Sequence, residues 1–262
     1  MRVAIATTYR ILLALAAGSV VVLQALILNK LVHWSPWTVV TVAAVVAGVT
    51  FLDNLRLLFY KFQAHQREAS RSRMHTPLIG ALNAVATARD VPLESLGISV
   101  FAIRKYLGMK WYLIPWLKQR LKRVFRFRLS DYPPESNVRW TKGKGTIGDC
   151  WQTGVAALHD RRPTAKRYGK GHHPTEQEFS TMSAADRSGF TRTQFIQTID
   201  KYGEILAVPI VKRNTGALLG VLSIDCLASA YAERKTSVLG GAAIEEIAGG
   251  AAFTVRDDVP RF

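Results

Sequence analysis

GEILAVPIVKRNTGALLGVLSIDCL, residues 203–227, predicts two β-strands around a tight turn. The Asn and Gly of KRNTG accept the positive φ values that tight hairpin turns need. The second strand is mostly apolar on both faces, as Val221 on one face and Leu222 on the other illustrate. Such a strand is typical of the centre of a sheet covered on both sides. Pro209 in the first strand predicts a bulge or a sheet edge, because proline cannot donate to a strand ladder.

Two segments predict the helices that cover this sheet. Residues 76–90 place Leu78, Leu82 and Val85 on one helical face, and residues 231–253 predict a last helix. Helices packed on the faces of a central antiparallel sheet form an α+β sandwich, which is the fold class we expect.

Two further strands are predicted before the hairpin, at 96–105 and 121–130. In the second of them apolar and cationic side chains alternate, which predicts one buried face and one basic face. The expected buried positions are Phe125, Phe127 and Leu129, and the expected basic positions are Arg126 and Arg128.

The composition favours anionic partners and gives little support for catalysis. The chain has 262 residues, with 35 Lys and Arg against 19 Asp and Glu, and a net charge of +16. This charge suits nucleotides, nucleic acid or anionic lipid without choosing among them. The two cysteines, Cys150 and Cys226, form no CxxC or Cys/His cluster, so we expect no metal site. No Ser-His-Asp, P-loop or zinc motif is present, so we expect no enzyme; a thiol enzyme using Cys150 is the alternative to a small core residue there.

Two uncharged apolar runs at 11–29 and 34–52 predict a transmembrane hairpin over 1–56. Each run approaches the roughly 20 residues that a helix needs to cross a bilayer, and the link between them is too short to hold a domain. A cleaved signal peptide is the alternative for the first run. Cations flank both outer ends, whereas the link offers only Lys30, which predicts a multi-pass inner-membrane protein with both termini in the cytoplasm. Residues 57–73 are expected to form a juxtamembrane linker helix.

The segment 104–128 contains nine Lys or Arg and no acid, with aromatic residues interleaved. Trp and Tyr prefer the headgroup level of a bilayer, and each cation near anionic lipid contributes about 1 kcal/mol. We therefore predict contact with the inner membrane surface. A solvated basic face and a patch for single-stranded nucleic acid are the alternatives, and the membrane tether disfavours nucleic acid. The predicted membrane-surface residues are Lys110, Trp111, Trp116, Lys118, Arg120 and Lys122.

A glycine-rich segment at 139–160, RWTKGKGTIGDCWQTGVAALHD, precedes the closing hairpin. The two segments, and the order of helix, two strands, glycine-rich segment, variable helical region, hairpin and last helix, resemble a GAF domain over residues 78–255. The resemblance implies a sensory domain at 74–256 followed by a polar tail at 257–262. It also implies a ligand pocket between the sheet and the variable helices.

The region implied to form this pocket, about 150–201, is rich in cations. Arginine suits phosphate, so we expect a small anionic ligand, with nucleotides among the candidates; a solvated loop is the alternative. The Asn-Lys-Phe-Asp-Glu pattern of cyclic-nucleotide GAF domains is absent, which disfavours an ordinary cyclic mononucleotide, and no cofactor can be named. The predicted ligand-binding residues are Trp151, Arg161, Arg162, Lys166, Arg167, Phe190 and Arg192.

These patterns together predict a membrane-anchored cytosolic sensor that forms a homo-oligomer. It would signal through its transmembrane hairpin or a partner protein, and in a sharper version the hairpin itself disrupts the membrane. The alternative is a ligand-free GAF-like scaffold that dimerises at the membrane through its first and last helices. Gly-Gly pairs at 240–241 and 249–250 would permit close packing there.

Overall fold

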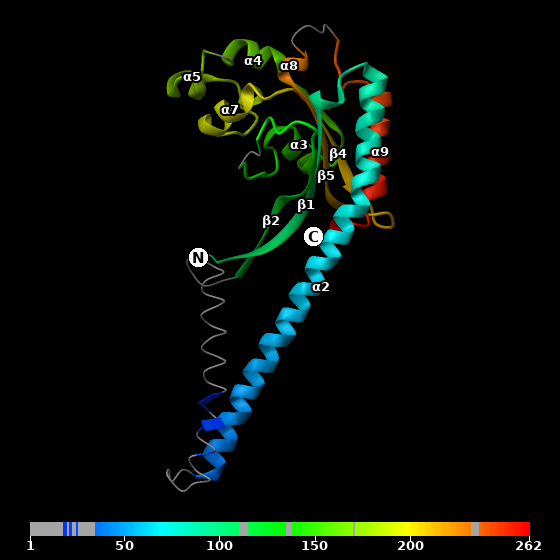
Figure 1. The fold of residues 1–262 in the computed structure, drawn as a ribbon. Coiled ribbons are helices and arrows are strands. Elements are labelled where there is room, and N and C mark those ends of the chain that lie inside the picture. Colours follow the sequence, from blue (N-terminus) through cyan, green and yellow to red (C-terminus); the bar gives the residue numbers. More distant parts are fainter. Residues whose placement is uncertain are drawn as a thin grey trace. The chain divides into compact units, whose positions relative to one another are not determined.

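The computed structural model describes residues 18, 19, 21, 22, 25, 35–109, 115–134, 138–169, 171–231 and 236–262. The chain divides into two compact units, Met1–Gln66 and Arg67–Phe262, and each is described by itself. Helix α2, Pro36–Arg89, begins in the first unit and ends in the second (Figure 1). Residues 57–73 are part of this continuous helix.

The first unit offers a candidate membrane span in α2. Among the described residues one helix, Val40–Arg89, is long and apolar enough to cross a membrane, judged by length and composition. Large apolar side chains within it are exposed, for example Phe51 at 65% and Leu52 at 63%. This helix overlaps the second predicted span. The first predicted span, at 11–29, falls largely outside the described residues, so the hairpin and its orientation stay predictions.

The second unit is built on a five-stranded antiparallel sheet in the order β2-β1-β5-β4-β3. This sheet, with helices against it, confirms the predicted α+β class (Figure 1). The strands are β1 Leu96–Met109, β2 Pro115–Phe127, β3 Ala157–Asp160, β4 Tyr202–Val211 and β5 Leu218–Leu227.

The closing hairpin lies where the sequence predicts it, with β5 in the centre of the sheet. Leu222 is opposite Val100 of β1 on one side and Val208 of β4 on the other. Pro209 pairs with Val221 of β5, but β3 reaches only as far as Ala207 along the other side of β4. The proline therefore occupies a local edge of the sheet on the β3 side, as predicted.

Helices cover the two faces of the sheet with separate apolar clusters. On one face the end of α2 and helix α9, Ala242–Val255, bury Leu78, Leu82 and Ile244 against the strands (Figure 1). On the other face helix α3, Gly145–Thr153, contributes Ile147 to a smaller cluster. This arrangement covers both faces of β5, which explains why its sequence is mostly apolar on both faces.

Short helices fill the variable region between β3 and β4. They pack around Phe195, which is fully buried. The bounds are α4 Arg162–Tyr168, α5 Glu176–Thr181, α6 Ala184–Arg187 and α7 Arg192–Ile199; α8 Ala228–Tyr231 follows β5, and the 3-10 turns are Leu93–Ser95 and Val259–Arg261.

Two expectations were wrong in detail. Strand β2 ends at Phe127, so the alternation stops there: Leu129 is 60% exposed, and Arg128 is buried in an ion pair with Asp225 instead of lying on a basic face. The last helix begins at Ala242 instead of at residue 231. The backbone N–H groups of Val238 and Leu239 donate to the Glu204 carboxylate and not to the carbonyls of a preceding helical turn.

Candidate ligand-binding cavity

A cavity lies between the sheet and the helices α3 and α7. Its interior volume is about 40 Å³, and it opens to solvent at its mouth. Strands, loops and helix ends all contribute to its wall. The lining residues are Ser99, Phe101, Arg123, Trp140, Gly145, Thr146, Ile147, His159, Arg161, Ser188, Phe190, Thr198, Tyr202, Ile205, Ser223 and Asp225.

The first turn of α3 forms one wall of this cavity. The helix starts without a side-chain cap on its N-terminal amides, and the Gly145 N–H donates to the carbonyl of Ser188. A helix N-terminus carries partial positive charge, so this wall favours an anion. Gly145 has φ +57, and a Cβ there would approach the Phe190 ring to 2.8 Å, so glycine is required where helix and ring meet.

Arg161 brings a full positive charge to the same cavity. Its backbone N–H donates to the Gly203 carbonyl at 2.8 Å, which holds the residue beside β4. The guanidinium reaches the Thr198 carbonyl and hydroxyl only at 3.5 Å, and it lies over the Phe190 ring at 5.7 Å. Although the residue keeps some exposed surface, burial lowers the pKa of Arg161 to about 10, so it stays charged at neutral pH.

The charge of Arg161 has no acidic partner in the described part of the chain, where no carboxylate lies within ion-pair distance of it. Desolvating a charge without a counter-charge is costly, and two long neutral contacts compensate it poorly. The contacts of the Arg161 guanidinium with Thr198 therefore leave its charge without a strong compensating partner.

The other titratable groups of the wall add little negative charge. The Asp225 carboxylate is bound by Arg128. Burial lowers the pKa of His159 below its ordinary value; Asp149, 3.2 Å from Nε2, opposes this, and Arg161 adds to it. His159 is therefore neutral at pH 7, and the cavity keeps the positive potential of Arg161.

Aromatic rings line the cavity beside these polar groups. Phe101 and Trp140 meet edge to face at 5.9 Å between ring centroids, and Trp140 meets Phe190 in the same way at 6.0 Å. Rings next to a cation and a helix N-terminus suit a ligand that combines a flat apolar part with an anionic group.

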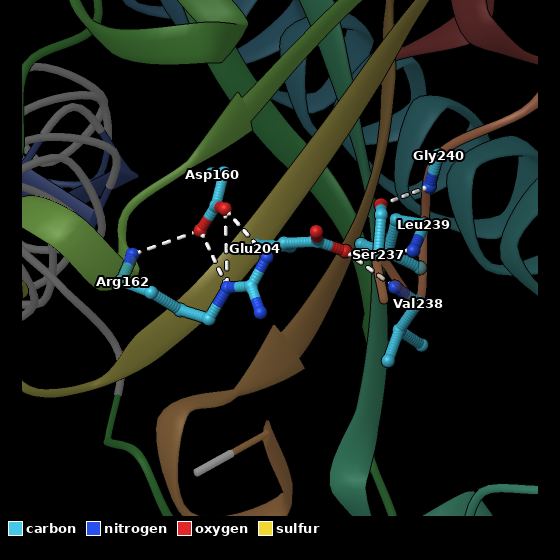
Figure 2. A network of polar contacts seen from close by, with 7 residues as sticks. All are labelled: Asp160, Arg162, Glu204, Ser237, Val238, Leu239 and Gly240. Carbon is cyan, nitrogen blue, oxygen red and sulfur yellow. Dashed lines mark hydrogen bonds and ion pairs between the residues drawn. The ribbon is translucent and has the colours of Figure 1, made fainter. Parts of the chain in front are cut away.

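The seven predicted ligand-binding residues do not gather in one place. Arg161 and Phe190 line the cavity. Arg162 points to the Asp160 carboxylate instead, with Nη2 to Oδ2 at 2.7 Å (Figure 2). The others lie elsewhere: Trp151 is buried beneath Lys142, Lys166 and Arg167 are exposed on α4, and Arg192 donates to the Pro174 carbonyl.

Sequence reasoning missed most of the wall. Ser99, Ser223 and Asp225 lie on paired strands, opposite one another or two residues apart, so the period of two along β1 and β5 is the signal that could have found them. His159 and Tyr202 carry no such signal in the sequence.

The predicted membrane-surface residues are described only in part. Lys118, Arg120 and Lys122 are exposed on β2. Lys110 and Trp111 lie outside the described residues, and Trp116 belongs to β2 without a described side chain.

Cys150 is a core residue on α3. Its side chain is fully buried, and burial raises the pKa of the thiol to about 12, which keeps it protonated at neutral pH. We expect neither Cys150 nor the equally buried Cys226 to react with a thiol reagent such as DTNB in the folded chain. Both should react once guanidinium unfolds the protein. Rapid labelling of Cys150 in the native state would contradict its placement.

Within the described part of the chain, no group of three His, Cys, Asp or Glu side chains could hold a metal.

No protein-family model and no curated protein matches the chain. Among solved structures, the chain is similar to the GAF domain of an Acinetobacter phosphoenolpyruvate-protein phosphotransferase, with 13% identity over 76% of this chain and 93% of that one and a TM-score of 0.37. It is also similar to a structure described as the GAF domain, with 13% identity over 76% and 88% and a TM-score of 0.35. Likenesses of this size assign neither a ligand nor a family to the chain.

Proposed function

We propose that this protein is a membrane-anchored, GAF-like sensor whose cavity binds a small anionic ligand. The observation that carries the proposal is Arg161, a desolvated guanidinium with no carboxylate partner among the described residues, beside the N-terminus of α3. The ligand's anionic group would take the place of the missing counter-charge, and its flat part would lie against the aromatic rings.

The membrane part of the proposal rests on α2. Its apolar side chains around Phe51 and Leu52 are exposed over a length that suits a bilayer. Signalling through this helix or through a partner protein would then link the ligand to the membrane. In the sharper version, ligand-driven association opens the bilayer, and ion leakage from liposomes that hold the full chain tests it. No leakage with a ligand that binds would leave the helix as an anchor.

A thermal-shift screen of the full chain in neutral detergent tests ligand binding. The panel would hold cyclic mono-, di- and oligonucleotides, haem and common carboxylate and phosphate metabolites. A ligand at 100 times its Kd stabilises the folded state by about 2.7 kcal/mol, which such a screen detects. We expect a hit among the anions. In Arg161→Gln the apparent affinity for that ligand should fall at least about tenfold, because a charge-assisted hydrogen bond is worth roughly 1.5–3 kcal/mol.

Arg167→Gln is the matched control, since it removes one exposed cation from α4 without touching the cavity. Equal loss of binding in both variants would mean that bulk charge, and not the cavity, attracts the ligand. A well-folded chain that responds to nothing in the panel would favour the ligand-free scaffold. In that reading the exposed Phe253 of α9, near Gly249 and Gly250, would meet a second copy.

A further inference from the structure

The β1–β2 hairpin runs past the rest of the sheet. Strand β1 pairs with β5 only from Leu96 to Ala102, whereas its pairing with β2 continues to Met109. The part of the hairpin beyond Ala102 therefore has β2 as its only described strand neighbour. The cations that the sequence concentrates here stand on this extension.

Like charges are placed directly opposite one another on this extension. Arg104 of β1 pairs with Arg120 of β2, and Lys122 lies two residues from Arg120, on the same face of the strand. Like charges at directly opposite positions destabilise a sheet. A sequence with no acid between residues 96 and 130 provides no compensation within the hairpin.

The end of α2 that belongs to the second unit adds to this charge. Burial lowers the pKa of Lys122, and repulsion from Arg67, Arg104, Arg120 and Arg71 lowers it further. Four arginines from one helix and two strands thus act on Lys122. We call this set, Arg67, Arg71, Arg104, Arg120 and Lys122, the cation cluster.

Arg104 and Arg71 donate to neutral groups. Arg104 donates to the carbonyls of Val259 and Pro260 at 3.3 and 3.4 Å, and its Nε is buried without a hydrogen-bond partner. Arg71 donates to the Val124 carbonyl at 3.1 Å. No carboxylate in the described part of the chain lies within ion-pair distance of Arg104, Arg120 or Lys122. The repulsion among Arg104, Arg120 and Lys122 is therefore left for an external anion to offset.

We propose that the cation cluster binds the phosphate of an anionic phospholipid headgroup. Guanidinium groups bind phosphate oxygens in pairs, and several of them from different elements make a site more specific than a scattered basic face. The choice of a lipid over a soluble phosphate rests on the proposed membrane attachment, since Arg67 and Arg71 belong to the same helix as the candidate span. This site is separate from the cavity, whose walls include none of the five residues.

The test uses the full chain in neutral detergent. Its unfolding temperature is followed as phosphatidylglycerol, phosphatidylcholine or inorganic phosphate is added. We expect phosphatidylglycerol alone to raise it. In Arg104→Gln/Lys122→Gln the lipid concentration for half the effect should rise at least about tenfold, since each cation near anionic lipid contributes about 1 kcal/mol. The matched control is Lys166→Gln/Arg167→Gln, which removes the same charge from exposed positions of α4 and should respond as the unaltered chain does.

Three results would overturn the inference: an equal loss in the α4 control, an equal response to phosphatidylcholine, or an equal response to inorganic phosphate. The lipid-free unfolding temperature of the cluster variant should stay level or rise, because repulsion has been removed. Lys122→Gln alone, at an exposed position, repeats the test if the double variant does not fold. If the lipid test fails but a ligand still raises the unfolding temperature in an Arg161-dependent way, the proposed sensor stands without the lipid site. Release of the chain from membranes by high salt would instead count against its membrane anchoring.

Discussion

Asp225→Ala should destabilise the second unit by about 3–5 kcal/mol, because it leaves a buried guanidinium without its counter-charge. The Arg128 side chain is only 3% exposed and forms an ion pair with Asp225, while its second Nη has no hydrogen-bond partner. Arg128 also lies over Gly97, the residue opposite Asp225 in β1, where a Cβ would meet the guanidinium at 2.3 Å. The guanidinium is therefore packed directly against the backbone of β1. Urea unfolding of the full chain in detergent, followed by circular dichroism, measures the effect.

Two variants distinguish a stranded charge from simple loss of contacts. Arg128→Met added to Asp225→Ala should recover most of the lost stability, because no unpaired charge remains. Asp160→Ala breaks the partly exposed pair with Arg162 and the bond from the Arg162 backbone N–H, and should cost at most about 2 kcal/mol. If Asp225→Ala cost no more than Asp160→Ala, the Arg128 guanidinium would have to reach solvent.

The sheet and its helical cover could be predicted because their signals are local and periodic. Strand β5 is apolar on both faces apart from Ser223 and Asp225, and the turn KRNTG joins it to β4. Leu78, Leu82 and Val85 recur at helical spacing, and all three are fully buried. Such patterns predict structure well because the same face of a helix or strand is buried along its whole length.

The cavity could not be predicted in this way, since its wall combines side chains that are far apart in the sequence, the first being Ser99 and the last Asp225. Arg161 and Arg162 are adjacent and chemically identical, yet one faces the cavity and the other binds Asp160. The end of β3 at Asp160 decides between them, and nothing in the sequence marks that end. The pairing of Arg104 with Arg120 likewise depends on the strand register, which basic composition alone does not specify.

Glu204→Leu is expected to cost about 2–6 kcal/mol, because it removes the acceptor of two buried backbone amides at about 1–3 kcal/mol each. Glu204 is fully buried on β4, and its Oε2 accepts from the N–H groups of Val238 and Leu239 at 2.9 and 2.7 Å (Figure 2). These bonds fix the segment that leads into α9. The residue after Leu239 is Gly240, and its carbonyl accepts from Arg89 at the end of α2.

Glu204→Gln is the control, since its amide oxygen can accept from both amides while the negative charge is lost. We expect it to cost about 1 kcal/mol, in keeping with the weaker bonds that neutral acceptors make. Hydrogen exchange at Val238 and Leu239 gives a local readout: Glu204→Leu should speed it far more than Glu204→Gln. Equal exchange in the two variants would mean that side-chain volume, and not the carboxylate's two bonds, holds this segment. The carboxylate would then have no part in linking β4, which supplies Tyr202 and Ile205 to the cavity, to the helix pair α2 and α9.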